Sequence, residues 1–178
     1  MVYLFLIDNF EEIEALSTVD ILRRAEIPVT TVGIFGNELK GAHGISVKAD
    51  KLFEETDFSD AEALILPGGM GSLDFLKHTA LCDLLSVHAK QEKLIAAICA
   101  APSVLGELGL LRGYRATCYP GFEERLLGAT YTGESVCVDR NCVTARGPGV
   151  SDQFAFQLVS LLKNQQVVES LRKAMQYE

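Results

Sequence analysis

Apolar residues in this chain form short continuous runs that alternate with stretches of helical periodicity. The continuous runs predict strands buried on both faces of a sheet, at residues 2–7, 28–34, 61–66 and 93–98. Apolar positions at helical spacing predict helices over residues 11–25, 79–90, 100–109, 150–163 and 165–176. A glycine-rich hairpin is expected over 36–47, and a second hairpin joins 135–138 to 142–145.

The alternation of strands and helices predicts an α/β fold, in which helices cover both faces of a mostly parallel sheet. No linker-like stretch or internal repeat interrupts it, so residues 1–178 are interpreted as a single domain. In such a sheet, ligands bind at the carboxyl ends of the strands. The loops 8–14, 67–71 and 99–102 follow three predicted strands, so we expect an acid, a glycine turn and a thiol to meet there.

Composition and charge exclude several classes of protein. The chain has 16 basic and 24 acidic residues and no basic run, which argues against nucleic-acid binding as its main role. The apolar start at residues 1–7 lacks the basic front and cleavage site of a signal peptide, and no apolar run is long enough to span a membrane. The 5 cysteines are scattered and form no CxxC pair, which predicts a reducing, cytoplasmic location without disulfides or a zinc site.

Cys99 ends the apolar run 94–98 and precedes small residues and Pro102, which predicts a tight turn from a strand into a helix. This is the geometry of a nucleophile elbow with cysteine in place of serine. The positive end of the helix dipole is expected to favour the thiolate. The alternative is a packed core cysteine, because free cysteine is among the most buried residue types.

Three glutamates, Glu11, Glu12 and Glu14, occupy the start of the first predicted helix, where acidic side chains stabilise the helix dipole. The other interpretation is that one of them lies beside the thiol, with a raised pKa, and moves protons. The glycine turn at 67–69 is either a plain loop or brings backbone N–H groups to an oxyanion, together with the N–H of Ala100.

The three histidines, His43, His78 and His88, are expected on the surface and away from Cys99. They show no metal-ligand spacing. A Cys–His dyad is therefore not predicted.

Four motifs, in this order, resemble the ThiJ/PfpI superfamily in the branch of the parkinsonism-associated deglycase, over essentially the whole chain. They are Glu-Glu-Ile-Glu at 11–14 with the helix at 19–25, Leu-Pro-Gly-Gly at 66–69, the segment 94–102 around Cys99, and Arg-Gly-Pro-Gly at 146–149.

The resemblance implies a flavodoxin-like three-layer α/β/α sandwich, of the class I glutamine amidotransferase-like kind. It assigns Cys99 as the nucleophilic, oxidation-prone cysteine and Glu14 as the glutamate that hydrogen-bonds this thiol. Gly69 and Ala100 would supply the oxyanion-hole N–H groups. It also implies a homodimer, for which the first helix, with Leu16 and Ile21, is the expected interface.

The activities implied by the resemblance are glutathione-independent glyoxalase and deglycation of proteins and nucleotides. We expect Cys99 to attack small 2-oxoaldehydes such as methylglyoxal, or their adducts, and to release a 2-hydroxy acid without cofactor or metal. One alternative is a cysteine-based oxidative-stress sensor or chaperone. A weaker one is an amidotransferase- or peptidase-like hydrolase.

One departure from the family pattern concerns Tyr119, which stands where many relatives carry a histidine before the proline. Without that imidazole, proton transfer falls to Glu14, and the peptidase branch is disfavoured. The neighbouring Cys118 is expected to be a packed thiol, with a resolving role toward Cys99 as the alternative.

Overall fold

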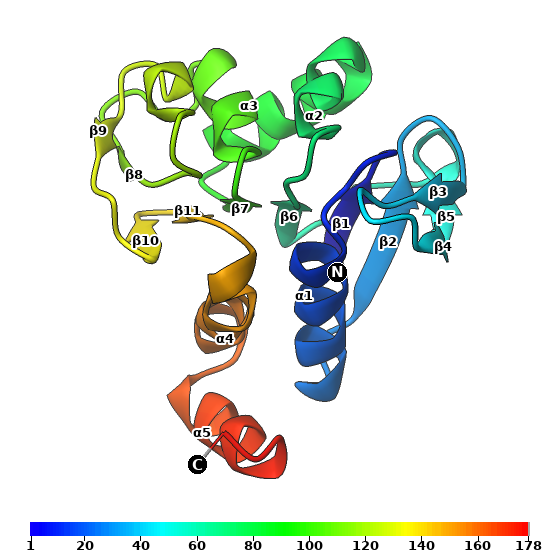
Figure 1. The fold of residues 1–178 in the computed structure, drawn as a ribbon, viewed down its shortest axis with the longest axis vertical. Coiled ribbons are helices and arrows are strands. Elements are labelled where there is room, and N and C mark those ends of the chain that lie inside the picture. Colours follow the sequence, from blue (N-terminus) through cyan, green and yellow to red (C-terminus); the bar gives the residue numbers. More distant parts are fainter. Residues whose placement is uncertain (178) are drawn as a thin grey trace.

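The computed structural model describes residues 1–177, and its central feature is a seven-stranded sheet in the order β10-β11-β7-β6-β1-β2-β5 (Figure 1). All neighbouring strands are parallel except β10 and β11, which form an antiparallel hairpin at one edge. The predicted mostly parallel sheet is therefore confirmed. The strands are β1 (Val2–Leu6), β2 (Val29–Gly33), β5 (Lys51–Leu52), β6 (Ala63–Leu66), β7 (Leu94–Ile98), β10 (Val136–Asp139) and β11 (Cys142–Ala145).

Helices cover both faces of this sheet. On one face α1 (Glu12–Arg24) packs against α4 (Ser151–Leu162), and α5 (Gln165–Ala174) packs on α4 (Figure 1). The other face is covered by α2 (Thr79–Lys90) and α3 (Pro102–Glu107). Strand β1 serves both layers, because Leu4 and Leu6 join the α1/α4 core while Tyr3 and Phe5 join the α2/α3 core. The three-layer α/β/α sandwich is confirmed.

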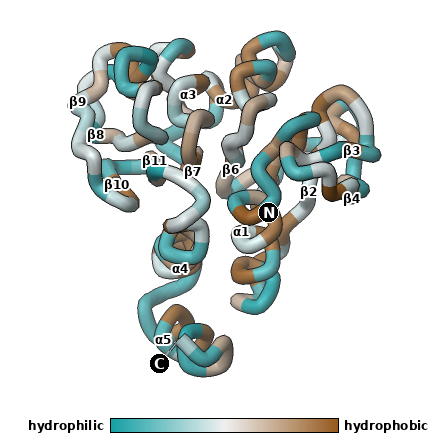
Figure 2. The backbone as a smooth tube through the Cα atoms, in the orientation of Figure 1, coloured by the Kyte–Doolittle hydropathy of each residue, from teal (hydrophilic) through white to brown (hydrophobic). Residues whose placement is uncertain are grey.

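Helix α1 shows why the chain folds this way locally. Its N-cap is Glu11, whose Oε2 accepts the N–H of Glu14 at 2.8 Å, and Arg23 and Arg24 occupy the last turn. Figure 2 shows hydrophobic and hydrophilic bands following each other along the helix. Its apolar side packs on the sheet, with Ala15, Val19 and Leu22 buried.

Several short elements appear that the hydropathy pattern did not predict. They are strands β8 (Arg115–Ala116) and β9 (Thr130–Tyr131), edge strand β5, and the 3-10 helices η1 (Phe53–Glu55), η2 (Ser72–Lys77), η3 (Glu123–Arg125) and η4 (Pro148–Val150). Strands of two residues and short 3-10 helices carry too little periodicity to be recognised. The predicted hairpin over 36–47 is present as β3 (Glu38–Lys40) and β4 (Ser46–Lys48).

The predicted helix at 100–109 is shorter than expected, because Pro102 starts α3 and the chain leaves the helix before Gly109, whose φ is +73°.

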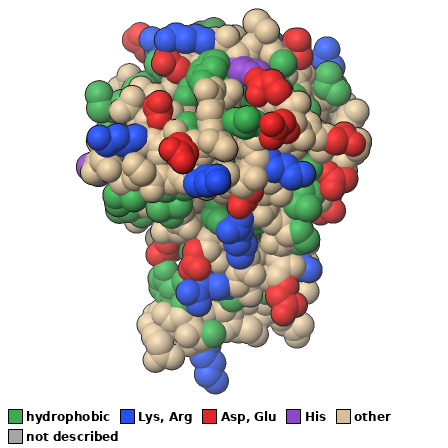
Figure 3. Space-filling model, turned by 90° about the vertical axis from the view of Figure 1, so that its right-hand side faces the viewer, with side chains coloured by type: hydrophobic (Ala, Val, Ile, Leu, Met, Phe, Trp, Pro, Cys, Tyr) green, Lys and Arg blue, Asp and Glu red, His purple; other side chains and the backbone are tan. Residues whose placement is uncertain are grey.

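The surface agrees with the charge pattern of the sequence. On the face drawn in Figure 3, basic and acidic side chains are interspersed rather than gathered by sign. Within residues 1–177, no helix combines the length and apolar character that crossing a membrane requires. All five cysteines are free. The single domain predicted for residues 1–178 stays a prediction, and Glu178 lies outside the described residues.

Candidate active site

Three loops meet at the carboxyl ends of β1, β6 and β7, which are neighbours in the sheet. The N–H of Glu11 donates to Gly68 O at 3.0 Å, and the N–H of Gly71 donates to Asn9 O at 3.2 Å. Both bonds tie the loop after β1 to the loop after β6. Cys99 follows β7 directly. The convergence expected from the topology of a parallel sheet is therefore present.

Cys99 occupies a strained turn. Its φ is +66°, a left-handed conformation that side chains with a β-carbon rarely adopt. Two long-range hydrogen bonds hold it there: its N–H donates to Ala145 O at 2.8 Å, and its carbonyl accepts the N–H of Tyr119 at 2.8 Å. The strand, the strained cysteine and the helix beginning at Pro102 form the predicted elbow.

Gly68 packs against both Cys99 and Glu14. A β-carbon at Gly68 would lie 2.6 Å from Cys99 Cβ and 2.7 Å from Glu14 Oε2, so only glycine fits between them. Its N–H donates to Glu14 Oε2 at 2.8 Å. The glutamate that the resemblance assigned to the thiol is thus the one that lies beside it.

The carboxyl of Glu14 is fully buried. Burial raises its pKa to about 7, although hydrogen bonds with the Cys99 side chain and with the Gly68 N–H lower it. The charge of nearby Glu11 raises it further. Oε2 accepts the N–H of Gly68, while Oε1 has no hydrogen-bond partner within residues 1–177. A carboxyl that changes charge near neutral pH is suited to moving protons.

The thiol of Cys99 does not have the low pKa that the helix dipole was expected to give. Burial, followed by the charge and hydrogen bond of Glu14, raises the pKa of Cys99 to about 12. Helix α3 has 6 residues and starts three positions later, so its dipole is short and displaced. The thiol loses its proton most readily when Glu14 is protonated or accepts that proton, because the two groups titrate as a pair.

Backbone N–H groups of Gly69 and Ala100 interact with the Cys99 sulfur and lower its pKa. Gly69 has φ +101°, and a β-carbon there would lie 2.5 Å from Glu11 N. The glycine therefore lets the loop after β6 lie close against the loop after β1. Both N–H groups face the Cys99 sulfur, and their role as an oxyanion hole stays a prediction.

Glu11 and Glu12, the other two glutamates at the start of α1, stabilise the structure around the site. Glu11 caps α1. Glu12 holds the β3–β4 connection: its Oε1 accepts the N–H of His43 at 2.7 Å and that of Ile45 at 3.4 Å, and its Oε2 contacts His43 Nδ1 at 2.8 Å. A ligand atom from each of Glu11, Glu12 and His43 lies within 4.8 Å of the others, which is a spacing that a cation tolerates.

None of the three histidines serves the thiol. His43 is exposed and pairs with Glu12, and His78 is half-buried and caps α2 by accepting the N–H of Leu81 at 3.2 Å. His88 was expected on the surface, but it is buried, with Nε2 3.1 Å from Leu94 O. The Leu94 carbonyl gives this buried ring a hydrogen-bond partner. The expected absence of a Cys–His dyad agrees with these placements.

Tyr119 and Cys118 lie on the chain segment that contacts the elbow. Tyr119 fixes the Cys99 carbonyl through its backbone, and its side chain is exposed. Cys118 is fully buried in the α2/α3 core, whereas Cys99 belongs to the α1/α4 core. This separation favours the packed interpretation of Cys118 over a resolving thiol.

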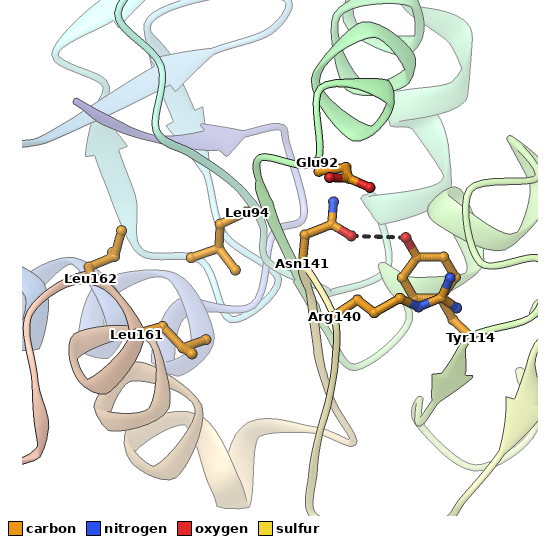
Figure 4. A pocket seen from close by; sticks show the side chains of 7 residues that line it. All are labelled: Glu92, Leu94, Tyr114, Arg140, Asn141, Leu161 and Leu162. Carbon is orange, nitrogen blue, oxygen red and sulfur yellow. Dashed lines mark hydrogen bonds between the residues drawn. The ribbon is translucent and has the colours of Figure 1, made fainter.

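A pocket at the opposite end of β7 does not belong to this site. It is lined by seven residues, among them Leu94, the first residue of β7, whereas Cys99 follows the last (Figure 4). In it Arg140 lies 3.4 Å from the centre of the Tyr114 ring, and Tyr114 Oη donates to Asn141 Oδ1 at 2.9 Å. These contacts fasten the β10–β11 hairpin to the loop before β8.

Sequence reasoning missed two features of the site. The close packing of Gly68 against both the acid and the thiol was not predicted. The contact of Gly147 with the Tyr119 ring was not predicted either. The Arg-Gly-Pro-Gly motif was the available signal, but its distance along the chain from Cys99 concealed the contact.

The DJ-1/PfpI family model matches residues 1–161. Protein dj-1beta of Drosophila melanogaster is 33% identical over 169 residues, which cover 93% of this chain and 90% of that protein. The crystal structure of Drosophila melanogaster DJ-1beta aligns with a TM-score of 0.92 at 31% identity, covering 98% of this chain and 96% of that one. DJ-1 homolog B of Arabidopsis thaliana is 35% identical over 171 residues, and the chain spans 39% of its length.

Three further relatives have names that state an activity. The glutathione-independent glyoxalase DJR-1.2 of Caenorhabditis elegans is 29% identical over 94% of this chain and 91% of its own length. A deglycase of Pyrococcus abyssi is 30% identical over 88% and 95% of the two lengths. A putative cysteine protease, YraA of Bacillus subtilis, is 35% identical over 88% and 94%. With its family model, its fold and its relatives in agreement, the chain belongs to the DJ-1/PfpI family.

Proposed function

We propose that this protein is a cofactor-independent glyoxalase or deglycase that acts on 2-oxoaldehydes, such as methylglyoxal, or on their protein and nucleotide adducts. The observation that carries this proposal is the buried, interacting pair of Cys99 and Glu14, with Gly68 packed against both and two backbone N–H groups facing the sulfur. Relatives named as a glyoxalase and a deglycase, at about 30% identity, support the same class of reaction.

In the first step, Glu14 accepts the thiol proton while the Cys99 sulfur attacks the aldehyde carbon. The carbonyl oxygen becomes an oxyanion, which the N–H groups of Gly69 and Ala100 stabilise. Protonation of this oxygen gives a hemithioacetal. The pKa of Glu14, raised to about 7, allows the carboxyl both to accept and to return a proton near neutral pH.

In the second step, Glu14 removes the proton from the former aldehyde carbon to give an enediol and returns it to the neighbouring carbon, while the hydroxyl proton passes from the first oxygen to the second. The product is a thioester of a 2-hydroxy acid on Cys99, which water hydrolyses to the free acid and the thiol. Methylglyoxal plus water gives lactic acid in this way. Electrons and atoms balance without an external oxidant or reductant, so the reaction requires no redox cofactor.

The test is lactate formation from methylglyoxal by the purified protein. We expect Cys99→Ala and Glu14→Gln to lose turnover, while Cys82→Ala, which removes a half-buried thiol on α2, retains it. Equal lactate formation by Cys99→Ala and the parent protein would refute the mechanism.

A second candidate is an oxidative-stress sensor in which Cys99 is oxidised to the sulfinic acid. The N–H groups of Gly69 and Ala100, with a protonated Glu14, would donate hydrogen bonds to its oxygens. Peroxide treatment followed by mass spectrometry separates the two, since a sensor requires Cys99 to oxidise before the other thiols.

A hydrolase of the peptidase or amidotransferase kind has less support, although one relative is named a putative cysteine protease. No histidine within residues 1–177 lies at the thiol, and Glu14 is the available base. In Cys–His peptidases a histidine takes the thiol proton and passes it to the leaving amine, and this site has no histidine for that role among the described residues. Failure to cleave a casein substrate would agree with this ranking.

We also propose a cytoplasmic homodimer with no membrane or nucleic-acid partner. The side chains of Ile13 and Leu16 on α1 are 55% and 37% exposed, so they are free to contact a second copy. Ile21, expected at the same interface, is instead buried in the core because it lies on the sheet-facing side of α1. Light scattering at micromolar concentration should give twice the chain mass, and Ile13→Glu should shift it toward the monomer.

A further inference from the structure

A pocket of about 480 Å³ adjoins the Cys99 elbow, and it is lined by Tyr119, Pro120 and residues 146–150. Its two walls, Tyr119–Pro120 and residues 146–150, belong to the two chain segments that hydrogen-bond to the backbone of Cys99. The N–H of Tyr119 donates to Cys99 O, and the carbonyl of Ala145, directly before Arg146, accepts the N–H of Cys99. Both walls of the pocket are thus tied directly to the backbone of Cys99.

Gly147 allows the two walls of the pocket to pack against each other. A β-carbon at Gly147 would lie 3.2 Å from Tyr119 Cδ2, so the glycine lets the aromatic ring lie against the backbone. Pro148 and Val150 add apolar surface. The Tyr119 side chain is 46% exposed, so part of its ring is open to a ligand. Apolar walls with a few fixed polar groups are typical of small-molecule sites.

The cation in this pocket is Arg146. Its backbone is fixed, because its N–H donates to Ser135 O at 3.1 Å, and its side chain is exposed. Its guanidinium makes no ion pair or hydrogen bond with any other residue in the range 1–177. By contrast, Arg115 and Arg125 are each paired with a glutamate. An unpaired guanidinium offers a fork of N–H donors that matches a carboxylate.

We propose that this pocket is the subsite for a carboxylate on the substrate and that Arg146 is the residue that binds it. The inference rests on the proposed function, and it narrows the substrate class to 2-oxoaldehydes or adducts with an acidic group beyond the reacting carbonyl. A single guanidinium balances the single charge of a carboxylate. The chain carries a net charge of −8, so an acidic substrate needs such a local cation to approach the thiol.

The first experiment measures charge preference at Cys99 without relying on turnover. The probes are two methanethiosulfonates of similar size, one with an anionic sulfonatoethyl group and one with a neutral hydroxyethyl group. The thiolate attacks the sulfenyl sulfur, forms a mixed disulfide and releases methanesulfinate. Mass spectrometry of the Cys99 peptide gives both rates for the parent protein and for Arg146→Gln, Arg146→Lys and Arg112→Gln.

We expect the ratio of the anionic to the neutral rate to fall about tenfold in Arg146→Gln, because a charge-assisted hydrogen bond is lost. Arg146→Lys should keep part of the preference, since lysine keeps the positive charge but lacks the paired N–H donors of a guanidinium. Arg112→Gln removes an exposed charge from the loop after α3 and should keep the parent ratio. Added salt should reduce the preference of the parent protein. An unchanged ratio in Arg146→Gln overturns the subsite.

The second experiment compares turnover of methylglyoxal with that of 4,5-dioxopentanoate, a 2-oxoaldehyde that ends in a carboxylate. The expected product of the latter is 2-hydroxyglutarate. Arg146→Gln should lower kcat/KM for the acidic substrate more than for methylglyoxal, mainly through KM. If neither substrate is turned over but the probe ratio shifts, the proposed function fails and the subsite stands. If both are turned over with no selective effect of Arg146→Gln, the subsite fails and the function stands.

Discussion

Glu14 and Cys99 interact through their side chains, and Gly68 packs so closely against both that it has no room for a β-carbon. The acid comes from the first turn of α1, and the thiol from the end of β7. Their contact therefore depends on the approach of one backbone segment, which makes Gly68 the first position to test.

Gly68→Ala should destabilise the protein by about 1–3 kcal/mol, the usual cost of overpacking a closed interior. The added methyl would meet Cys99 Cβ, Glu14 Oε2 and Ile98 O, all within 2.9 Å. Denaturant unfolding measures the loss, and methylglyoxal turnover should fall with it. The matched control is Gly36→Ala, because nothing lies within 4 Å of a β-carbon there. Equal stability of the two variants would contradict the close approach.

Glu14→Gln should make the protein more stable above neutral pH. The pKa of Glu14 is about 7 when folded and 4.5 when unfolded, so the folded state binds the proton more tightly. The stability from this proton is fully present below pH 4.5 and is lost as pH rises through 7, amounting to about 3 kcal/mol. Unfolding of both proteins at pH 4 and pH 8 should show a gain for the variant at pH 8 alone. A gain of equal size at both pH values would contradict the raised pKa.

The rate of methylglyoxal turnover should rise with pH through about 7, because ionised Glu14 accepts the thiol proton in the first step. The measurement is the pH profile of kcat/KM for lactate formation. Glu14→Gln should abolish the rise of kcat/KM with pH, along with most of the activity. Glu169→Gln, an exposed change on α5, should leave the profile as it is. A flat parent profile from pH 6 to pH 8 would exclude Glu14 as the base.

Glu12→Ala should loosen the connection between β3 and β4. The carboxylate of Glu12 accepts the N–H groups of His43 and Ile45, and hydrogen bonds to a charged group hold such amides firmly. Hydrogen exchange at these two amides should therefore speed up roughly tenfold or more. His43→Ala removes the ring but keeps the backbone donors, so its effect should be smaller. Identical exchange in Glu12→Ala and the parent protein would show that other contacts hold this loop.

The layers of the fold could be predicted from the sequence. The separate roles of the residues within the site could not. Strands buried on both faces give continuous apolar runs, which is why β1, β6 and β7 were predicted within one or two residues. The elements missed were two- or three-residue strands and 3-10 turns, which are stabilised by distant partners rather than by local pattern.

The three glutamates at 11, 12 and 14 show the same limit at the level of the site. Residue type and helical position suit all of them to the helix N-terminus. The resemblance, and not periodicity, selected Glu14, and the structure shows why the others differ: Glu11 turns back to cap the helix and Glu12 reaches the hairpin. The pKa of Cys99 was misjudged for a related reason, because burial and a neighbouring charge outweigh a short helix dipole.

The left-handed backbone at Cys99 has a consequence for the newly made chain. The two partners that hold it, Ala145 and Tyr119, come later in the sequence than the cysteine itself. While the chain emerges from the ribosome, Cys99 is therefore free to relax to an ordinary conformation, without the elbow. The elbow is therefore expected to form only when β11 closes onto β7, so the backbone geometry of the nucleophile depends on residues that are made after it.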